Sequence, residues 1–440
     1  MEILIQVTQL ILSLSILVIF HELGHFTFAK LFGTRVEKFY LFFNPWFSLF
    51  KIKRGDTEYG VGWVPLGGYV KISGMIDESM DKEQMKKPPQ AWEFRSKPAW
   101  QRLLIMVGGV LVNFILAICI YIGMLNVYGE QYLPTENVKY GITCDSLALE
   151  IGFCNGDKII SVNNEKVENF DKIFAEIILN KPKNIVVERD GQLKEIKITD
   201  ETIAKIIKHN KPFFDLRFPF IAGDFTENSA AKKAGMQVGD KICGLNGQKI
   251  EFFDEFRDKI GDYKNMEVVV SVERSNEEVE LTMTIPEEGV IGVYPRGNLG
   301  EFFEFETIDY SFAQSVPAGI SKGYKEIGDF LKQLRILFSP KTEAYKSLGG
   351  FIAIGKIFPS DWQWQIFWRL TAFLSIMLGV INILPIPALD GGHVLFLMYE
   401  IITGKAPGDK FLEYAQITGM IILLILVVFA NGNDIVKLFN

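Results

Sequence analysis

Residues 3–25 read ILIQVTQLILSLSILVIFHELGH: an uncharged run of eighteen residues continues directly into a His-Glu-Leu-Gly-His sequence. A helix needs about 20 mainly apolar residues to cross the hydrocarbon core of a bilayer. The run therefore predicts a membrane-spanning helix whose last turns carry two histidines and a glutamate. Cleavage of the run as a signal peptide is the alternative, but Glu2 stands where a basic residue is typical, and the helical pattern continues to Leu31.

Three further apolar runs occupy residues 103–127, 366–384 and 411–430. Backbone polar groups inside hydrocarbon must pair within the chain, so we expect all four runs to be helices. From Lys30 to Arg102 there are thirteen Lys or Arg against eight acids, whereas the residues before the first run contain no Lys or Arg. The positive-inside rule therefore predicts that this loop is cytoplasmic and that both chain ends lie outside.

The composition argues against several classes of protein. The 440 residues carry a formal net charge of −7 without a basic tract, so we expect no nucleic-acid partner. With 36 Phe, 14 Tyr and 7 Trp, the chain has enough apolar surface for folded domains. Four cysteines without a CxxC pair indicate neither a disulfide scaffold nor a cysteine metal site. Whether Cys144 and Cys154 form a disulfide stays open.

Residues 143–173 and 226–256 align without gaps and are identical at 13 of 31 positions, which indicates two copies of one small domain. In each copy we expect a short helix, a Gly-Asp turn, a strand, and a second helix that begins near Phe170 or Phe253. The pattern resembles bacterial PDZ domains. That resemblance implies a groove beside an exposed strand that binds a peptide or chain end, whereas folding and spacing without any ligand is the alternative.

The His-Glu-Leu-Gly-His sequence predicts a metal site. Residues i and i+4 of a helix share one face, so the imidazoles of His21 and His25 can reach the same ion. Glu22 stands near enough to take a proton from an attacking water. A pair of surface histidines is the alternative, but ionisable groups in an apolar span are costly unless they are ligated or paired.

Catalytic zinc takes a third protein ligand and keeps one open position. No further histidine lies shortly downstream, since His209 and His393 are the only others. Residues 382–392 read NILPIPALDGG, in which two prolines end a membrane helix and Asp390 follows. Taken alone, Asp390 is also explained as a helix N-cap. Together with the two histidines, it becomes the candidate third ligand.

These two motifs together resemble the site-2 protease family of intramembrane zinc metalloproteases. The four-span order, the PDZ-like copies and WVPLGGYVKISG at 63–74 are similar to its RseP-like group, the regulators of sigma-E proteases. The resemblance implies one Zn²⁺ per chain, held by His21, His25 and Asp390, with Glu22 as the general base. It also implies a place in the bacterial inner membrane and cleavage of single-span membrane proteins, such as an anti-sigma factor or leftover signal peptides.

The resemblance also points to substrate-binding residues. Asn382 is expected to position the substrate or its oxyanion, and Asn113 matches a GxxxN position of the family on the second span, with Val110 where many members have Pro. A transmembrane substrate must unwind before it is cut, and its freed backbone groups then need partners. The alternation in 59–72 predicts a hairpin whose edge strand pairs with the substrate, although a purely structural hairpin is the alternative. Three of its residues are candidate contacts: Gly67, Gly68 and Tyr69.

We therefore expect a multi-pass membrane protein with four transmembrane α-helices, a membrane-associated β-hairpin region and two tandem extracytoplasmic PDZ (α+β) domains. A membrane-anchored PDZ scaffold with a structural or inactive metal site is the alternative function. The expected segments are 1–34 with the first span, 35–102 as a cytoplasmic or membrane-reentrant β region, 103–128 as the second span, 129–208 and 209–297 as the PDZ domains, 298–363 as amphipathic extracytoplasmic helices, 364–384 as the third span, 385–410 as a cytoplasmic loop, and 411–440 as the fourth span and C-terminus.

Overall fold

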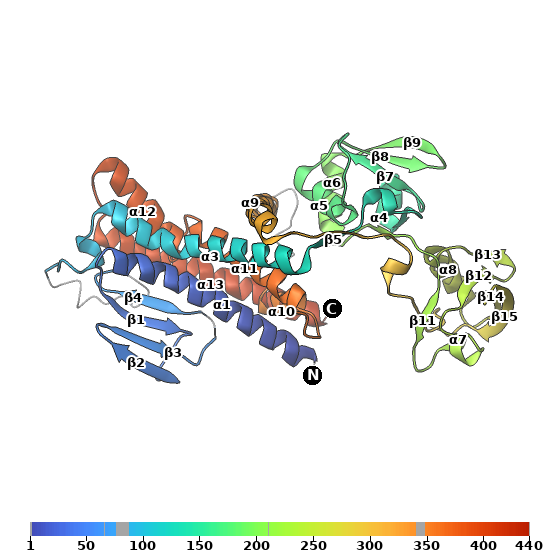
Figure 1. Cartoon of the computed structure of the whole chain (residues 1–440), viewed down its shortest axis with the longest axis horizontal. Coiled ribbons are helices and arrows are strands. Elements are labelled where there is room, and N and C mark those ends of the chain that lie inside the picture. The colour runs from blue at the N-terminus through green and yellow to red at the C-terminus, as the bar shows by residue number, and fades with distance from the viewer. Residues whose placement is uncertain (1, 66, 76–87, 210, 340–347, 440) are drawn as a thin grey trace. The chain divides into compact units, whose positions relative to one another are not determined.

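The computed structural model describes residues 2–65, 67–75, 88–209, 211–339 and 348–439. They form two compact units. In the first, the residues up to Gly129 pack with Asp309–Ser339 and with the C-terminal part of the chain, and Glu130–Ile308 make up the second. Figure 1 shows the order of helices and strands along both units.

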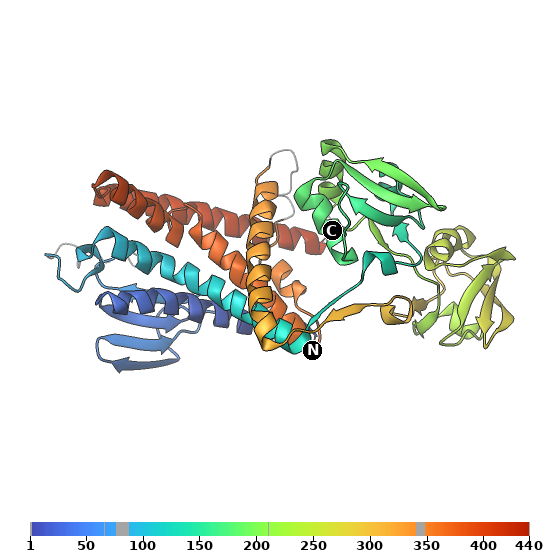
Figure 2. The same ribbon diagram turned by 45° about the horizontal axis from the view of Figure 1, so that its top comes forward.

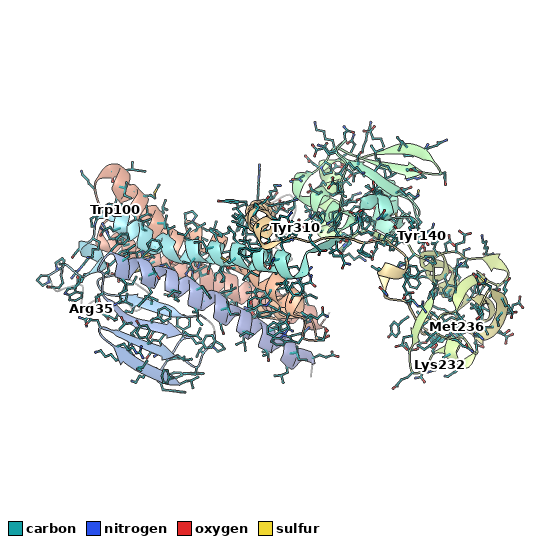
Figure 3. The ribbon with its side chains drawn as sticks, viewed as in Figure 1. Arg35, Trp100, Tyr140, Lys232, Met236 and Tyr310 are labelled. Carbon is teal, nitrogen blue, oxygen red and sulfur yellow. The ribbon has the colours of Figure 1, made fainter. Side chains whose placement is uncertain are left out.

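Four long helices build the first unit: α1 (Glu2–Leu31), α3 (Ala99–Tyr128), α11 (Trp364–Ile383) and α13 (Asp409–Phe439). Within the described part of the chain, these four are long and apolar enough to cross a membrane, as the apolar runs predict. Both α1 and α11 pack against α3, and the helices run side by side in Figures 1 and 2. Trp100, labelled in Figure 3, lies in the first turn of α3. It is half exposed, and tryptophan is enriched at membrane–water interfaces.

Glycines bring α1 and α3 close together beside the two histidines of α1. A Cβ atom on Gly24 would stand 2.2 Å from the carbonyl oxygen of Gly108. Small residues allow helix backbones to approach each other in this way inside membranes. Because Gly24 precedes His25 directly, this contact determines how near α3 lies to the histidine side chains.

Residues 36–72 form a four-stranded sheet with the order β2-β3-β1-β4. The strands are β1 (Val36–Leu41), β2 (Phe50–Arg54), β3 (Thr57–Val61) and β4 (Tyr69–Ile72). The hairpin expected over 59–72 is wrong, because β1 lies between β3 and β4 and pairs with both of them. The hairpin of this region is instead β2–β3, where Gly55 supplies the positive φ of 59° that a two-residue turn requires.

The segment 385–410, expected as a loop, contains the helix α12 (Asp390–Thr403). Its apolar residues pack against α3, and Arg102 of α3 forms an ion pair of 2.5 Å with Glu400. Gly391 allows α12 to begin directly after the turn that follows α11, since a Cβ atom there would stand 2.1 Å from the carbonyl oxygen of Leu384. Asp390 is thus the first residue of a helix, and Leu389 occupies the N-cap position.

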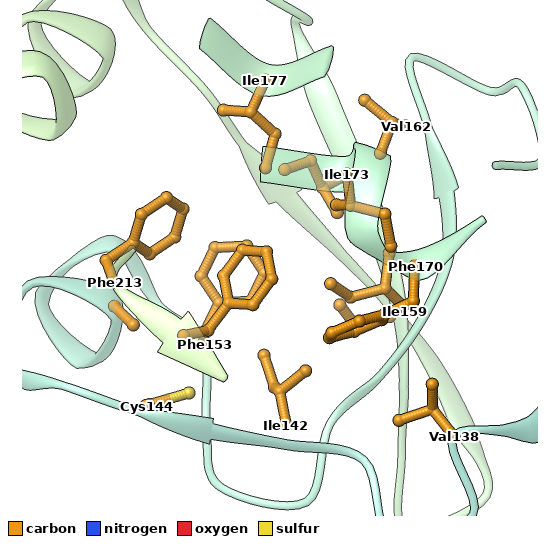
Figure 4. Packing of buried hydrophobic residues seen from close by; sticks show 14 of the residues in the cluster. Val138, Ile142, Cys144, Phe153, Ile159, Val162, Phe170, Ile173, Ile177 and Phe213 are labelled. Atoms are coloured by element: carbon orange, nitrogen blue, oxygen red, sulfur yellow. The ribbon is translucent and has the colours of Figure 1, made fainter. Parts of the chain in front are cut away.

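The second unit contains both copies of the repeat. The first copy holds α4 (Ser146–Ile151), β7 (Lys158–Val162), α5 (Ile173–Asn180), β8 (Asn184–Arg189) and β9 (Gln192–Lys197). The second copy holds α7 (Ala230–Lys233), β12 (Lys241–Leu245), α8 (Phe253–Ile260), β14 (Glu267–Arg274) and β15 (Glu277–Thr284). Each has a separate core, and Figure 4 shows the first, packed around Phe153, Ile173 and Phe213. The predicted order of helix, turn, strand and helix is confirmed in both copies.

Three further α-helices and seven further short strands lie among the described residues. The helices are α6 (Asp200–His209), α9 (Phe312–Leu337) and α10 (Phe351–Ile357). The short strands are β5 (Glu130–Tyr132), β6 (Ile142–Cys144), β10 (Phe214–Leu216), β11 (Ala222–Phe225), β13 (Gln248–Lys249), β16 (Val293–Pro295) and β17 (Glu306–Ile308). The strand β13 extends the sheet of the second copy. The helix α9 packs against α3 and α11, which makes it part of the first unit.

Candidate metal centre

Three side-chain atoms form a nearly equilateral triangle inside the first unit. Nε2 of His21 lies 3.3 Å from Nε2 of His25, and Oδ2 of Asp390 lies 3.2 and 3.3 Å from these two nitrogens. Both histidines belong to successive turns of α1, and the aspartate begins α12. Both imidazoles are buried, and 16% of the aspartate side chain is exposed. The three residues predicted as ligands are therefore brought together.

The triangle fits a zinc ion. Ligand atoms in tetrahedral zinc sites lie about 2.0–2.1 Å from the ion, so they stand about 3.3 Å from one another. Oδ2 of Asp390 is buried and receives no hydrogen bond from any described residue. Two imidazoles and one carboxylate also match a known ligand set of catalytic zinc, in which the fourth position stays open.

The main chain of α3 orients one of the imidazoles. Nδ1 of His25 lies 2.8 Å from the carbonyl oxygen of Ile105, which can only accept a hydrogen bond. Nδ1 therefore carries the ring proton and donates it, which leaves the lone pair of Nε2 pointing into the triangle. This is the tautomer that a metal ligand needs.

A cavity of about 470 Å³ opens beside the triangle. Glu22 lies on its wall together with the three candidate ligands, and β4 contributes all four of its residues. Among the described residues, β4 is the last strand in the order β2-β3-β1-β4, with β1 as its sheet partner. The cavity thus combines a cation site, a carboxylate and a strand edge.

The other sequence-predicted residues take different places. Gly68 and Tyr69 line the cavity, whereas Gly67 is not among its lining residues. Nδ2 of Asn382 lies 3.3 Å from Nε2 of His21. Asn113 is fully buried, with its side-chain nitrogen 3.2 Å from Nδ1 of the same histidine.

Sequence reasoning gave no role at the site to several residues around it, although Gly109 is the first residue of the GxxxN motif that pointed to Asn113. A Cβ atom on Gly109 would stand 2.4 Å from Nε2 of His25, so a glycine is needed for both imidazoles to fit. Ile105 was missed because its contribution is a main-chain carbonyl group. The spacing of Ile105, Gly109 and Asn113, four residues apart on α3, is the signal that connects them. His393 and Gln416 also line the cavity.

The chain is similar to known proteins over nearly its whole length. The model of peptidase family M50 matches residues 9–426, a range that includes all three candidate ligands. A Yersinia pestis protein named protease RseP is 28% identical over 468 aligned residues and is covered completely, as is this chain. The regulator of sigma E protease of Haemophilus influenzae is 29% identical, with 97% of this chain and 98% of that protein covered. A Vibrio cholerae protein assigned by name to the zinc metalloproteases is 30% identical, with the same coverage.

The fold and the site define a metallopeptidase whose framework is membrane helices. The chain belongs to peptidase family M50, the site-2 proteases. It is a membrane zinc metalloprotease, related over its whole length to proteins named RseP and regulator of sigma E protease. The family predicted from the sequence motifs is therefore confirmed, as are the enzyme class and the zinc cofactor.

Proposed function

We propose that the protein cleaves single-span membrane proteins within the bilayer, with His21, His25 and Asp390 as the zinc ligands and Glu22 as the general base. One observation carries this proposal: three ligand atoms from α1 and α12 lie 3.2–3.3 Å apart, and Glu22 stands beside them on the cavity wall. A purely structural metal site has no need of a carboxylate in that position.

The chemistry follows from the side chains. Zinc, when bound, supplies Lewis acidity that polarises a carbonyl group and makes water more acidic. Glu22 accepts a proton from the attacking water and passes it to the leaving amine. Nδ2 of Asn382 lies 3.3 Å from Nε2 of His21, and in this proposal it positions the substrate or the oxyanion that develops on it.

The strand β4 binds the unwound substrate. As the outer strand of its sheet, it pairs with the backbone groups that the substrate exposes on unwinding, which would otherwise cost several kcal/mol each in hydrocarbon. Gly67 has a φ of 145°, and a Cβ atom on Gly68 would stand 2.6 Å from the carbonyl oxygen of Tyr40. The two glycines therefore bring the chain tightly into β4, and Tyr69 is its first residue.

The two copies in the second unit act as PDZ domains outside the bacterial inner membrane, where both termini also lie. The orientation is supported by the excess of basic residues in 30–102. The PDZ assignment is supported by the shared helix, Gly-Asp turn and strand of both copies. They bind a peptide or chain end, or gate the access of substrates. An anti-sigma factor or leftover signal peptides are the proposed substrates; one relative is named regulator of sigma E protease.

Glu22→Gln tests this function in membranes that contain a single-span reporter. Loss of the general base is expected to lower the cleavage rate about 10²–10⁴-fold while zinc stays bound. Glu2→Gln, the same exchange at the exposed start of α1, is the matched control. His21→Ala and Asp390→Ala should lose zinc. Wild-type cleavage by Glu22→Gln would show that the proposed mechanism is wrong.

A further inference from the structure

Asn113 occupies the side of the His21 ring that faces away from the triangle. Its side-chain nitrogen lies 3.2 Å from Nδ1, and the residue is 0% exposed. Its own carbonyl oxygen accepts a hydrogen bond of 2.8 Å from Ser375 of α11, which holds this part of α3 in place. Asn113 does not line the cavity, and the partner that the structure gives its side-chain nitrogen is His21.

The orientation of the Asn113 amide and the tautomer of His21 depend on each other. If Nδ2 donates to Nδ1, the ring proton must sit on Nε2, where it would block a metal. If the amide turns by half a rotation, Oδ1 accepts the proton of Nδ1, and the lone pair of Nε2 becomes available. Oδ1 is buried and has no hydrogen-bond partner among the described residues, so this second arrangement gives it one.

The same face of α3 serves both imidazoles. Ile105, Gly109 and Asn113 are spaced four residues apart, which places them on one stripe of the helix. Gly109 leaves the space that the two rings occupy, since a Cβ atom would stand 2.4 Å from one ring and 2.7 Å from the other. The acceptor for His25 lies one turn before this glycine and the acceptor for His21 one turn after it.

We propose that Asn113 is a positioning residue that holds His21 in the Nδ1–H tautomer, and that it is not a substrate contact. This inference rests on the zinc ligation proposed above. It gives Asn113 a role that the GxxxN motif alone does not define. Partners of this kind orient metal-binding histidines, and their loss weakens metal binding about 10–100-fold.

The test measures the zinc affinity of the full-length protein in detergent by competition with a chelator. Asn113→Leu, which keeps a similar size but accepts no hydrogen bond, should bind zinc about 10–100-fold more weakly. Asn113→Asp, whose carboxylate accepts the Nδ1 proton, should stay within a few-fold of the wild type. The matched control is Asn126→Leu, on the exposed part of the same helix, where the amide bonds the Tyr310 carbonyl oxygen at 3.4 Å.

Wild-type zinc affinity in Asn113→Leu would overturn the inference, and so would an equal loss in Asn113→Asp. A raised KM with unchanged zinc affinity would instead place Asn113 on the substrate, which also overturns it. Should Asn113→Leu not fold, a loss of zinc affinity of about 10–100-fold in Asn113→Asp would still overturn the inference. A wild type that binds zinc and loses it in His21→Ala, yet cuts no single-span reporter, would reject the proposed function and leave this inference standing.

Discussion

At the scale of the residue, the repeated aspartate of the Gly-Asp turn has a structural role. Asp240 accepts two hydrogen bonds from Arg274, at 2.6 and 2.8 Å, and one from the backbone N–H of Gln237. Asp157 is held in the same way by Arg189 in the first copy. In each copy, this carboxylate connects the Gly-Asp turn to an arginine at the end of a distant strand. The aspartate therefore stabilises the fold of both copies.

This ion pair makes the second copy sensitive to acid. Burial raises the pKa of Asp240, but the hydrogen bonds from Arg274 and Gln237 outweigh it and lower the pKa below its usual value. The carboxylate therefore stabilises the fold above the unfolded pKa of about 4, and the stabilisation is lost as the pH falls through the folded pKa. We expect Asp240→Asn to reduce stability by about 2 kcal/mol at pH 7, because charge-assisted hydrogen bonds are lost, and to flatten this pH dependence.

Hydrogen exchange of β12 and β14 in the full-length protein measures the effect. Asp258→Asn, which alters an exposed ion pair on α8, is the control and should change little. Equal protection of these strands in Asp240→Asn and the wild type at pH 7 would contradict the role given to the pair.

At the scale of the element, the position of β4 against α1 is the feature to test. A Cβ atom on Gly68 would stand 2.6 Å from the Tyr40 carbonyl oxygen and 2.7 Å from Cγ1 of Val18. Gly68→Ala should therefore move the strand edge away from Glu22 and lower reporter cleavage by about 10-fold or more, with zinc content unchanged. Gly408→Ala, where a Cβ atom meets nothing within 4 Å, should cleave normally. Wild-type cleavage by Gly68→Ala would show that the position of β4 does not matter for substrate binding.

At the scale of the whole molecule, Arg217 connects the two copies of the repeat. Its backbone N–H bonds Gly141 in the first copy at 3.1 Å. Its guanidinium group pairs with Asp254 and Glu255 of the second copy and lies 3.9 Å from the centre of the Phe252 ring. Asp254 is 2% exposed, so without Arg217 its charge would be buried and unpaired.

Arg217→Ala should therefore loosen the connection between the copies. Spin labels, one in each copy, should report a broader distance distribution in this variant than in the wild type. Arg257→Ala is the control, because it removes an exposed arginine from α8, the helix that carries Asp254 and Glu255. It should leave the distance distribution unchanged. An unaltered distribution in Arg217→Ala would show that Arg217 does not hold the two copies together.

Local patterns predicted those parts of the fold that depend on neighbouring residues. The four apolar runs form helices because backbone polar groups in hydrocarbon must pair within the chain. His21 and His25 share a face because helical periodicity places them one turn apart. The strands β3 and β4 were recognised by alternation, but alternation says nothing about partners, and β1 was found between them. The helix α12 was taken for a loop because its stability depends on packing against α3.

The order of amino acids by itself determined the membrane helices, the two copies of the repeat and the pair of motifs that carry zinc chemistry. Only the tertiary structure decided that Asp390 meets both imidazoles and that α3 supports them through Ile105, Gly109 and Asn113. The physical reason is that ligand separations of 3.2–3.3 Å depend on how closely α1, α3 and α12 approach one another. Glycine contacts between distant segments set that approach, and no pattern within one segment contains them.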